Sequence, residues 1–342
     1  MNSSNYLTWG PSPEVFTIPE FYLPFSVSIF GLILSIIIFI LGWQKIKPAE
    51  KEERMEEPWR AWALGAVAFI VGQIPFLFLS SPTLDTIGPL QPRWYGLLFA
   101  CAFIFGYMIT FRMFRFAGRS QEDMDRLLIY VLIATIIGAR LGHVIFYDLD
   151  YYMRNIHQVP QVWTGGLASH GAAVGIIIAM YLYVKKTPGM TFFWLADRVV
   201  PAVAIGGMFI RIGNFMNSEI LGQPSDLPWA VIFEVSPHLT ETERLIPRHP
   251  SMLYEAVLCV LVFGVLWYIY KKYQNRPPEG SLFATFLVML FTGRFLIEFT
   301  KLAHSDIEAT WALNMGQWLS IPLVAYGIWV LVKQVNWKKQ GK

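Results

Sequence analysis

The sequence has little charge and almost no cysteine. Only 15% of its 342 residues are charged, whereas 55% are hydrophobic, and this balance is typical of a polytopic membrane protein rather than a water-soluble domain. Both cysteines, Cys101 and Cys259, fall inside apolar segments, so we interpret them as buried thiols and expect neither a disulfide framework nor a metal site. The net charge of +3 comes from basic residues in short loops. We therefore expect no nucleic-acid partner, and the sequence indicates no cofactor.

The apolar residues gather into nine segments that are long enough to cross a bilayer. A hydrocarbon core about 30 Å thick needs about 20 helical residues. The first segment begins too late and is too long for a cleaved signal peptide, and no small-residue cleavage site follows it. The predicted fold class is an all-α polytopic membrane protein with about nine transmembrane helices. The predicted spans are residues 25–43, 61–80, 94–111, 127–147, 170–184, 193–213, 252–270, 281–299 and 312–332.

Lysine and arginine are concentrated in alternate loops. Because these residues favour the cytoplasmic side of a membrane, the pattern predicts an external N-terminus and a cytoplasmic C-terminus. We expect three parts: an external N-terminal segment with a two-helix membrane hairpin (1–90), a membrane core (91–335) with an external loop (214–251), and a basic cytoplasmic tail (336–342).

Ionisable and amide side chains lie near the predicted outer ends of several spans. Such groups are costly at membrane depth and persist mainly where they face a polar cavity or a partner. Each has a structural alternative: Arg294 and Glu298, four residues apart, would form an ion pair on one helix face, and His170 would be an interfacial histidine. Their clustering at one depth favours a functional site. The set comprises Tyr95, Arg140, His143, His170, Arg211, Asn214, Asn217, Glu219, Arg294 and Glu298.

The segment RIGNFMNSEILG (211–222) is the most informative part of the sequence. Arg211, Asn214 and Asn217 recur every three residues, which keeps them on one face if the helix continues. A guanidinium flanked by amides suits a phosphate group, because arginine offers paired donors and stays charged. In the alternative interpretation, Arg211 extends to the lipid headgroups, and the two asparagines form hydrogen bonds between helices.

Several sequence blocks together resemble the prolipoprotein diacylglyceryl transferase family. They extend from about Arg93 to Tyr326, and the pair RIGNF..NSE..G and RHPS.LYE is highly specific. Their order agrees with the family, and their depths agree with the charge-based topology. The blocks are RWYGLLFA (93–100), GARLGHVIFYD (138–148), GGLASHGAAVG (165–175), RIGNFMNSEILG (211–222), RHPSMLYE (248–255), GRFLIEF (293–299) and MGQWLSIP (315–322).

The resemblance implies a transfer reaction at the outer leaflet of the bacterial inner membrane. The diacylglyceryl group of phosphatidylglycerol would pass to the lipobox cysteine thiol of a prolipoprotein, forming a thioether and releasing glycerol phosphate. A thiol with a pKa of about 8.5 must lose its proton before it attacks carbon. His170 is the predicted base, and a phosphate oxygen of the substrate is the alternative acceptor.

The resemblance also implies which residues bind the substrate. Arg211 and Arg294 would stabilise the leaving phosphate in a site of low dielectric. Glu219 and Glu298 would orient these arginines or bind the glycerol hydroxyls, and Gly222 would permit a close backbone approach. The complete predicted substrate-binding set is Tyr95, Asn214, Asn217, Glu219, Gly222 and Glu298.

The chain departs from the family pattern at several positions. Leu290 stands where the family usually has tyrosine, so that role is unassigned. His143 also replaces a tyrosine, and two roles are open for it: an extra titrating group or, as we expect, a packing residue. Lys301 replaces an arginine, which keeps the charge but loses the planar fork. The hairpin within residues 20–86 has no counterpart, and we expect it to be structural or to dock a partner. The loop 223–248 is predicted to cover the site and bind the signal segment of the prolipoprotein.

Two other classes of protein remain open from the sequence. A transporter would need charged residues along a path to both leaflets and internal repeats near the midplane, and we find neither pattern. A non-catalytic homologue would bind phosphatidylglycerol or lipoproteins without transferring lipid, and Leu290 is the main argument for it.

Overall fold

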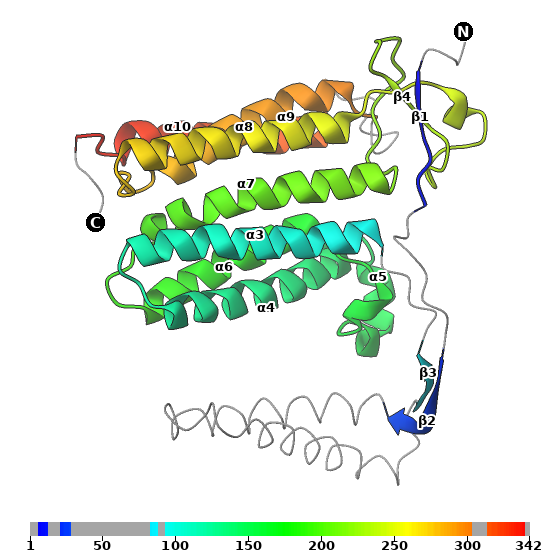
Figure 1. Cartoon of the computed structure of the whole chain (residues 1–342), viewed down its shortest axis with the longest axis horizontal. Coiled ribbons are helices and arrows are strands. Elements are labelled where there is room, and N and C mark those ends of the chain that lie inside the picture. Colours follow the sequence, from blue (N-terminus) through cyan, green and yellow to red (C-terminus); the bar gives the residue numbers. More distant parts are fainter. Residues whose placement is uncertain (1–5, 13–20, 29–82, 88–92, 303–312, 339–342) are drawn as a thin grey trace. The chain divides into compact units, whose positions relative to one another are not determined.

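The computed structural model describes residues 6–12, 21–28, 83–87, 93–302 and 313–338 (Figure 1). The chain forms two compact units. The larger unit comprises Met1–Pro13 and Arg93–Lys342, and the smaller unit is the intervening segment Glu14–Pro92.

In the smaller unit, β2 (Phe21–Ser28) pairs antiparallel with β3 (Thr83–Ile87). Because Val27 and Ser28 pair with β3, the predicted span 25–43 is wrong at its start, where the structure has a strand. The remainder of that span and all of the span predicted at 61–80 lie outside the described residues.

The larger unit is a bundle of long apolar helices. Within the described ranges, six helices are long and apolar enough to cross a membrane, which confirms a helical polytopic membrane protein. The span predicted at 170–184 is also a helix, but polar residues at both of its ends lower its hydropathy and it is not among the six. The helices are α3 (Trp94–Phe116), α4 (Gln121–Phe146), α6 (Ser169–Lys186), α7 (Phe192–Met216), α8 (Ser251–Lys272), α9 (Ser281–Ile297) and α10 (Met315–Lys333).

Local sequence explains where several of these helices begin. Ser120 caps α4 and Thr191 caps α7, since each hydroxyl accepts a backbone N–H from the first turn. Asn314 and Gln317 form a reciprocal capping box at the start of α10. Short helical turns fill the connections: α5 (Leu149–Arg154), η4 (Ile156–Gln158), η5 (Val162–Thr164), η6 (Glu243–Leu245) and η7 (Glu298–Thr300).

Buried Asp197 ties α7 to the start of α9. Its carboxylate accepts the backbone N–H of Gly280 at 2.7 Å and that of Phe283 at 2.8 Å. These N–H groups lack partners inside their own helix, so the carboxylate satisfies them and favours the positive end of the helix dipole. Asp197 thus stabilises the end of the bundle remote from Arg211.

Apolar packing joins the helices along their length. One buried cluster includes Met113 of α3, Val262 and Leu266 of α8, and Leu282 of α9, and Leu290 packs against it. Cys259 is buried, as predicted, but Cys101 is only half-buried. The reason is helical geometry: Ala102, the next residue, faces the neighbouring helix, and adjacent helical positions point in different directions.

Helices α4 and α6 approach each other through four glycines. Gly138 and Gly142 on α4 face Gly171 and Gly175 on α6, a small-xxx-small pattern on both helices. A Cβ on Gly171 would lie 2.7 Å from the Cα of Gly142. Only glycine fits here, because backbone rather than a movable side chain occupies the space.

The N-terminal strand joins the bundle next to the end of α7. β1 (Leu7–Trp9) pairs in parallel with β4 (Val231–Phe233), which is buried in the long loop between α7 and α8. The indole of Trp9 donates to the carbonyl of Phe215 at 3.0 Å and packs on its ring. Figure 1 shows β1 and β4 beside the ends of α7 and α8. We call this end of the larger unit the loop end.

Candidate functional site

Most of the predicted polar residues meet where α7 terminates. Arg211 Nη1 donates to Asn214 Oδ1 at 3.4 Å, and the amides of Asn214 and Asn217 each donate to Glu219 at 3.1 Å. The helix continues only to Met216, so Asn217 is its cap rather than part of the predicted face. The four residues nevertheless form one connected group.

The chain reaches this arrangement through an unusual backbone turn. Ser218 and Ile220 have positive φ angles of 54° and 57°. Residues other than glycine seldom adopt this conformation, and such strain often occurs at functional sites. The turn brings Glu219 back toward the amides of α7, and its own N–H bonds the carbonyl of Asn214 at 2.9 Å.

A chain of alternating buried charges extends from Arg211 across three elements. Glu255 on α8 pairs with Arg211 Nε at 2.9 Å and with Lys301 Nζ at 3.0 Å. Lys301 also pairs with Glu298 at 3.0 Å. Glu255, Lys301 and Glu298 are all buried. Buried ions are tolerated only when they are paired, so each member depends on its neighbours. We call Arg211, Glu255, Lys301 and Glu298 the charge chain.

The charge chain corrects two pairings that the sequence predicted. Glu298 contacts Lys301, not Arg294, because α9 ends at Ile297 and Glu298 opens the tighter turn η7. Arg294 forms no ion pair with any residue that the structure describes. Glu219 reaches Arg211 only through Asn214, while the direct carboxylate partner is Glu255.

Sequence reasoning missed Glu255 and Lys301 as site residues. Glu255 lies within the first turns of an apolar span, at the same predicted depth as the other polar residues, and ends the block RHPSMLYE. This depth and this block were the signals from which the sequence could have identified Glu255 as a site residue. Lys301 lies just beyond the predicted span, and its position at a family arginine was the signal that could have identified it. Its burial follows from a bridge with Gly222 and from packing in the folded loop end.

Glu298 also faces the beginning of α10. A Cβ on Gly316 would lie 2.6 Å from the carboxyl carbon of Glu298, so the carboxylate packs directly on the first turn of that helix. The positive end of the helix dipole favours an anion at this place. The loop end of α10 is thereby joined to the charge chain.

Tyr95 and Gly222 lie beside this group, as the sequence predicted. The ring of Tyr95 covers Gly213, where a Cβ would lie 2.9 Å from Cδ2, and Tyr95 interacts electrostatically with Arg211 and Glu219. Gly222 N–H donates to His249 O at 3.1 Å, and a Cβ on Gly222 would collide with the backbone there. The close approach expected of this glycine is present, while its role in substrate binding stays a prediction.

His170 lies at the exposed start of α6. Its ring contacts those of Phe146 and Tyr147, with centroid distances of 5.2 and 5.8 Å. Among the described residues, no hydrogen bond or ion pair joins His170 to the charge chain.

Buried Arg140 fixes the loop that leads to His170. Its guanidinium donates to the carbonyls of Gln158 and Val159 at 2.8 Å and to that of Gly165 at 2.6 Å. This residue is thus a scaffold of the site. His143 stacks on Tyr147, in accord with the predicted packing role, and also pairs with Asp148 at 3.0 Å.

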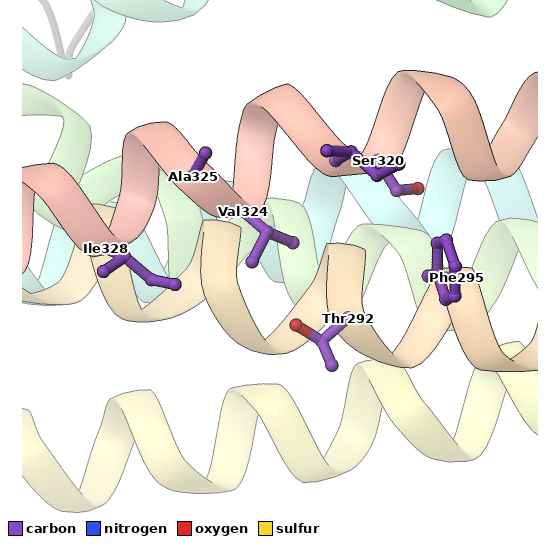
Figure 2. A pocket seen from close by; sticks show the side chains of 7 residues that line it. Thr292, Phe295, Ser320, Val324, Ala325 and Ile328 are labelled. Atoms are coloured by element: carbon purple, nitrogen blue, oxygen red, sulfur yellow. The ribbon is translucent and has the colours of Figure 1, made fainter.

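An apolar groove of about 370 Å³ runs between α9 and α10 (Figure 2). Thr292 lies on α9, and Val324 and Ile328 line the opposite side on α10. The carbonyl of Phe295, a lining residue, accepts a hydrogen bond at 3.3 Å from Gln317 in the first turn of α10, the turn on which Glu298 packs. The lining residues are Thr292, Phe295, Ser320, Ile321, Val324, Ala325 and Ile328.

Long apolar helices with buried, paired charges at one end define a polytopic membrane protein with a polar site at the loop end of its bundle. In the described part of the chain, no group of three or more His, Cys, Asp or Glu side chains is arranged to hold a metal ion. The family model "Prolipoprotein diacylglyceryl transferase" matches residues 82–333. The chain belongs to this family.

Curated relatives agree with the family match. Proteins named phosphatidylglycerol–prolipoprotein diacylglyceryl transferase are similar to this chain in three bacteria. The Tolumonas auensis protein is 41% identical over 249 residues, which is 73% of this chain and 93% of the relative. The Porphyromonas gingivalis protein is 40% identical and the Chloroherpeton thalassium protein 39% identical, each over 75% of this chain and 93% of the relative.

Proposed function

We propose that this protein transfers the diacylglyceryl group of phosphatidylglycerol to the lipobox cysteine of a prolipoprotein, the first step of lipoprotein maturation. The bond between the glycerol carbon and the phosphate oxygen breaks, a carbon–sulfur thioether forms, and glycerol phosphate leaves. The observation that carries the proposal is the family match over 82–333, which includes every residue of the charge chain.

Arg211 and Arg294 stabilise the phosphate in this proposal. Arg294 has no carboxylate partner among the described residues, and Arg211 engages Glu255 through Nε, so both retain donors for phosphate oxygens. Asn214 holds Arg211 from the opposite side. Fixed donors in a site shielded from water stabilise the charge that develops on the leaving group.

His170 accepts the thiol proton in this proposal, and a phosphate oxygen of the lipid is the other candidate acceptor. Histidine titrates near neutral pH, and His170 is exposed at the start of α6, where a thiol can approach it. Tyr95, Asn217, Glu219, Gly222 and Glu298 complete the proposed substrate-binding set.

The acyl chains and the protein substrate use apolar surfaces around the charges. The groove between α9 and α10 offers an acyl chain an apolar surface, and its lining residue Phe295 precedes Glu298 by three positions. The loop 223–248 serves the signal segment of the prolipoprotein in this proposal. It carries exposed apolar side chains at Leu227, Trp229, Val235, Leu245 and Ile246.

The proposed setting is the bacterial inner membrane, with the site toward the outer leaflet. Lysine and arginine in alternate loops support an external N-terminus, a cytoplasmic C-terminus and nine spans. Two of these spans belong to the proposed hairpin in 20–86, for which we propose a structural or partner-docking role.

The direct test uses purified protein with phosphatidylglycerol and a synthetic lipobox peptide. We expect peptide with the added mass of a diacylglyceryl thioether and an equal amount of released glycerol phosphate. A peptide with serine in place of cysteine should remain unmodified. Lipid binding without product would instead support a non-catalytic homologue, and lipid movement between leaflets without product would support a transporter.

A further inference from the structure

We infer that Glu255 is a positioning residue for the transfer reaction, which orients the guanidinium of Arg211 toward the substrate phosphate. The inference rests on the proposed function for its reaction and on the geometry of the charge chain for its mechanism. Glu255 would act through Arg211 and would not itself touch the lipid.

The first argument is the difference in exposure along the pair. The side chain of Arg211 is 21% exposed, whereas that of Glu255 is 5% exposed. The carboxylate therefore contacts Arg211 from the protein interior, and the exposed part of the guanidinium faces away from the interior. Arg211 Nε forms an ion pair with Glu255, and of the five N–H donors of Arg211 the described residues engage one in a hydrogen bond, on Nη1. The others suit a phosphate that binds through two oxygens.

The second argument is that Glu255 is itself immobilised. Its other oxygen pairs with Lys301, which pairs in turn with Glu298 beside the start of α10. Through these contacts, Glu255 connects Arg211 to the turn η7 and to the start of α10. Because Glu255, Lys301 and Glu298 are all buried, the carboxylate has little freedom to move away.

The third argument concerns electrostatics. A carboxylate 2.9 Å from Arg211 offsets part of the positive charge that attracts a phosphate. If the site required only affinity for an anion, Glu255 would be a disadvantage. Its presence is explained if the orientation of Arg211 limits the reaction, since a misplacement of about 1 Å can cost about 100-fold in rate.

The test compares Glu255→Gln and Glu255→Asp with Asp197→Asn. Asp197 is the matched control, because it is an equally buried carboxylate at the far end of α7. Turnover and the KM for phosphatidylglycerol are measured per folded protein. We expect Glu255→Gln to lower kcat by about 10- to 100-fold with a smaller change in KM, and Glu255→Asp to recover part of that loss. Asp197→Asn should lower thermal stability and leave kcat near normal.

A double-mutant cycle distinguishes positioning from a purely structural role. Equilibrium binding of phosphatidylglycerol in nanodiscs is measured for Glu255→Gln in the wild-type and the Arg211→Gln backgrounds. If Glu255 acts through Arg211, its substitution should change the affinity in the first background and have little effect in the second. Equal changes in both backgrounds, or no change in either, would overturn the inference. Because this cycle requires no chemistry, it decides the role of Glu255 even if the wild-type protein forms no thioether, the outcome that would instead overturn the proposed function.

Discussion

Replacing Gly171 with alanine should destabilise the protein, although alanine normally favours helices. A Cβ at this position would lie 2.7 Å from the Cα and 3.0 Å from the N of Gly142. Both atoms belong to the backbone, so α4 and α6 must move apart, and overpacking of this kind costs about 1–3 kcal/mol. Alanine also has a higher helix propensity than glycine, which offsets about 1 kcal/mol of this cost. The net loss is therefore between about 0 and 2 kcal/mol.

Gly264→Ala is the matched control, because no atom would lie within 4 Å of the new Cβ and Gly264 is also inside a helix. It gains the same propensity without the collision. The two variants should thus differ by about 1–3 kcal/mol in the free energy of unfolding, measured by denaturant titration in one detergent. Gly171→Ala should also lower transfer activity per folded protein, since it displaces the adjacent His170. Equal stability of the two variants would refute the close contact between α4 and α6.

Three further predictions concern the charged site. Arg211→Lys should not restore phosphatidylglycerol-dependent transfer, because lysine offers a point charge in place of a fork; near-normal turnover would contradict this. His170→Asn should fold and bind lipid but react about 10²- to 10⁴-fold more slowly, and a rate above half of the wild type would remove it as the base. Glu298→Gln and Lys301→Met should be non-additive in unfolding titrations because the side chains pair at 3.0 Å, whereas Glu298→Gln and Arg294→Ala should be close to additive.

Local patterns in the sequence were sufficient for the long helices of the larger unit and for part of the site. Arg211, Asn214 and Glu219 are close in sequence, so their grouping depends mainly on one helix end and one turn. The long apolar runs of the core helices can likewise be recognised without knowledge of the neighbouring helices. These features follow from interactions over short separations.

Contacts between residues that are far apart in the sequence could not be predicted. Glu255 meets Lys301 across 46 residues, and only the packing of α8 against the end of α9 determines this pair. The i, i+4 rule predicted an Arg294–Glu298 pair, but it holds only within a continuous helix, and the helix stops at Ile297. Likewise, no local pattern indicated that the N-terminal segment would join a strand near residue 231.

That N-terminal strand imposes an order on assembly. The bond from Trp9 to Phe215 spans 206 residues, and the partners of β1 lie still farther along the chain. At about 5–20 residues per second, a ribosome needs roughly 10–40 s to make the intervening segment. During that time β1 has no partner strand, while the inserted unit and the helices α3, α4, α6 and α7 are synthesised. Parallel pairing of β1 with β4 is therefore a late folding event. A protein fused to the N-terminus should slow this pairing, whereas a protein fused to the C-terminus should leave it unchanged.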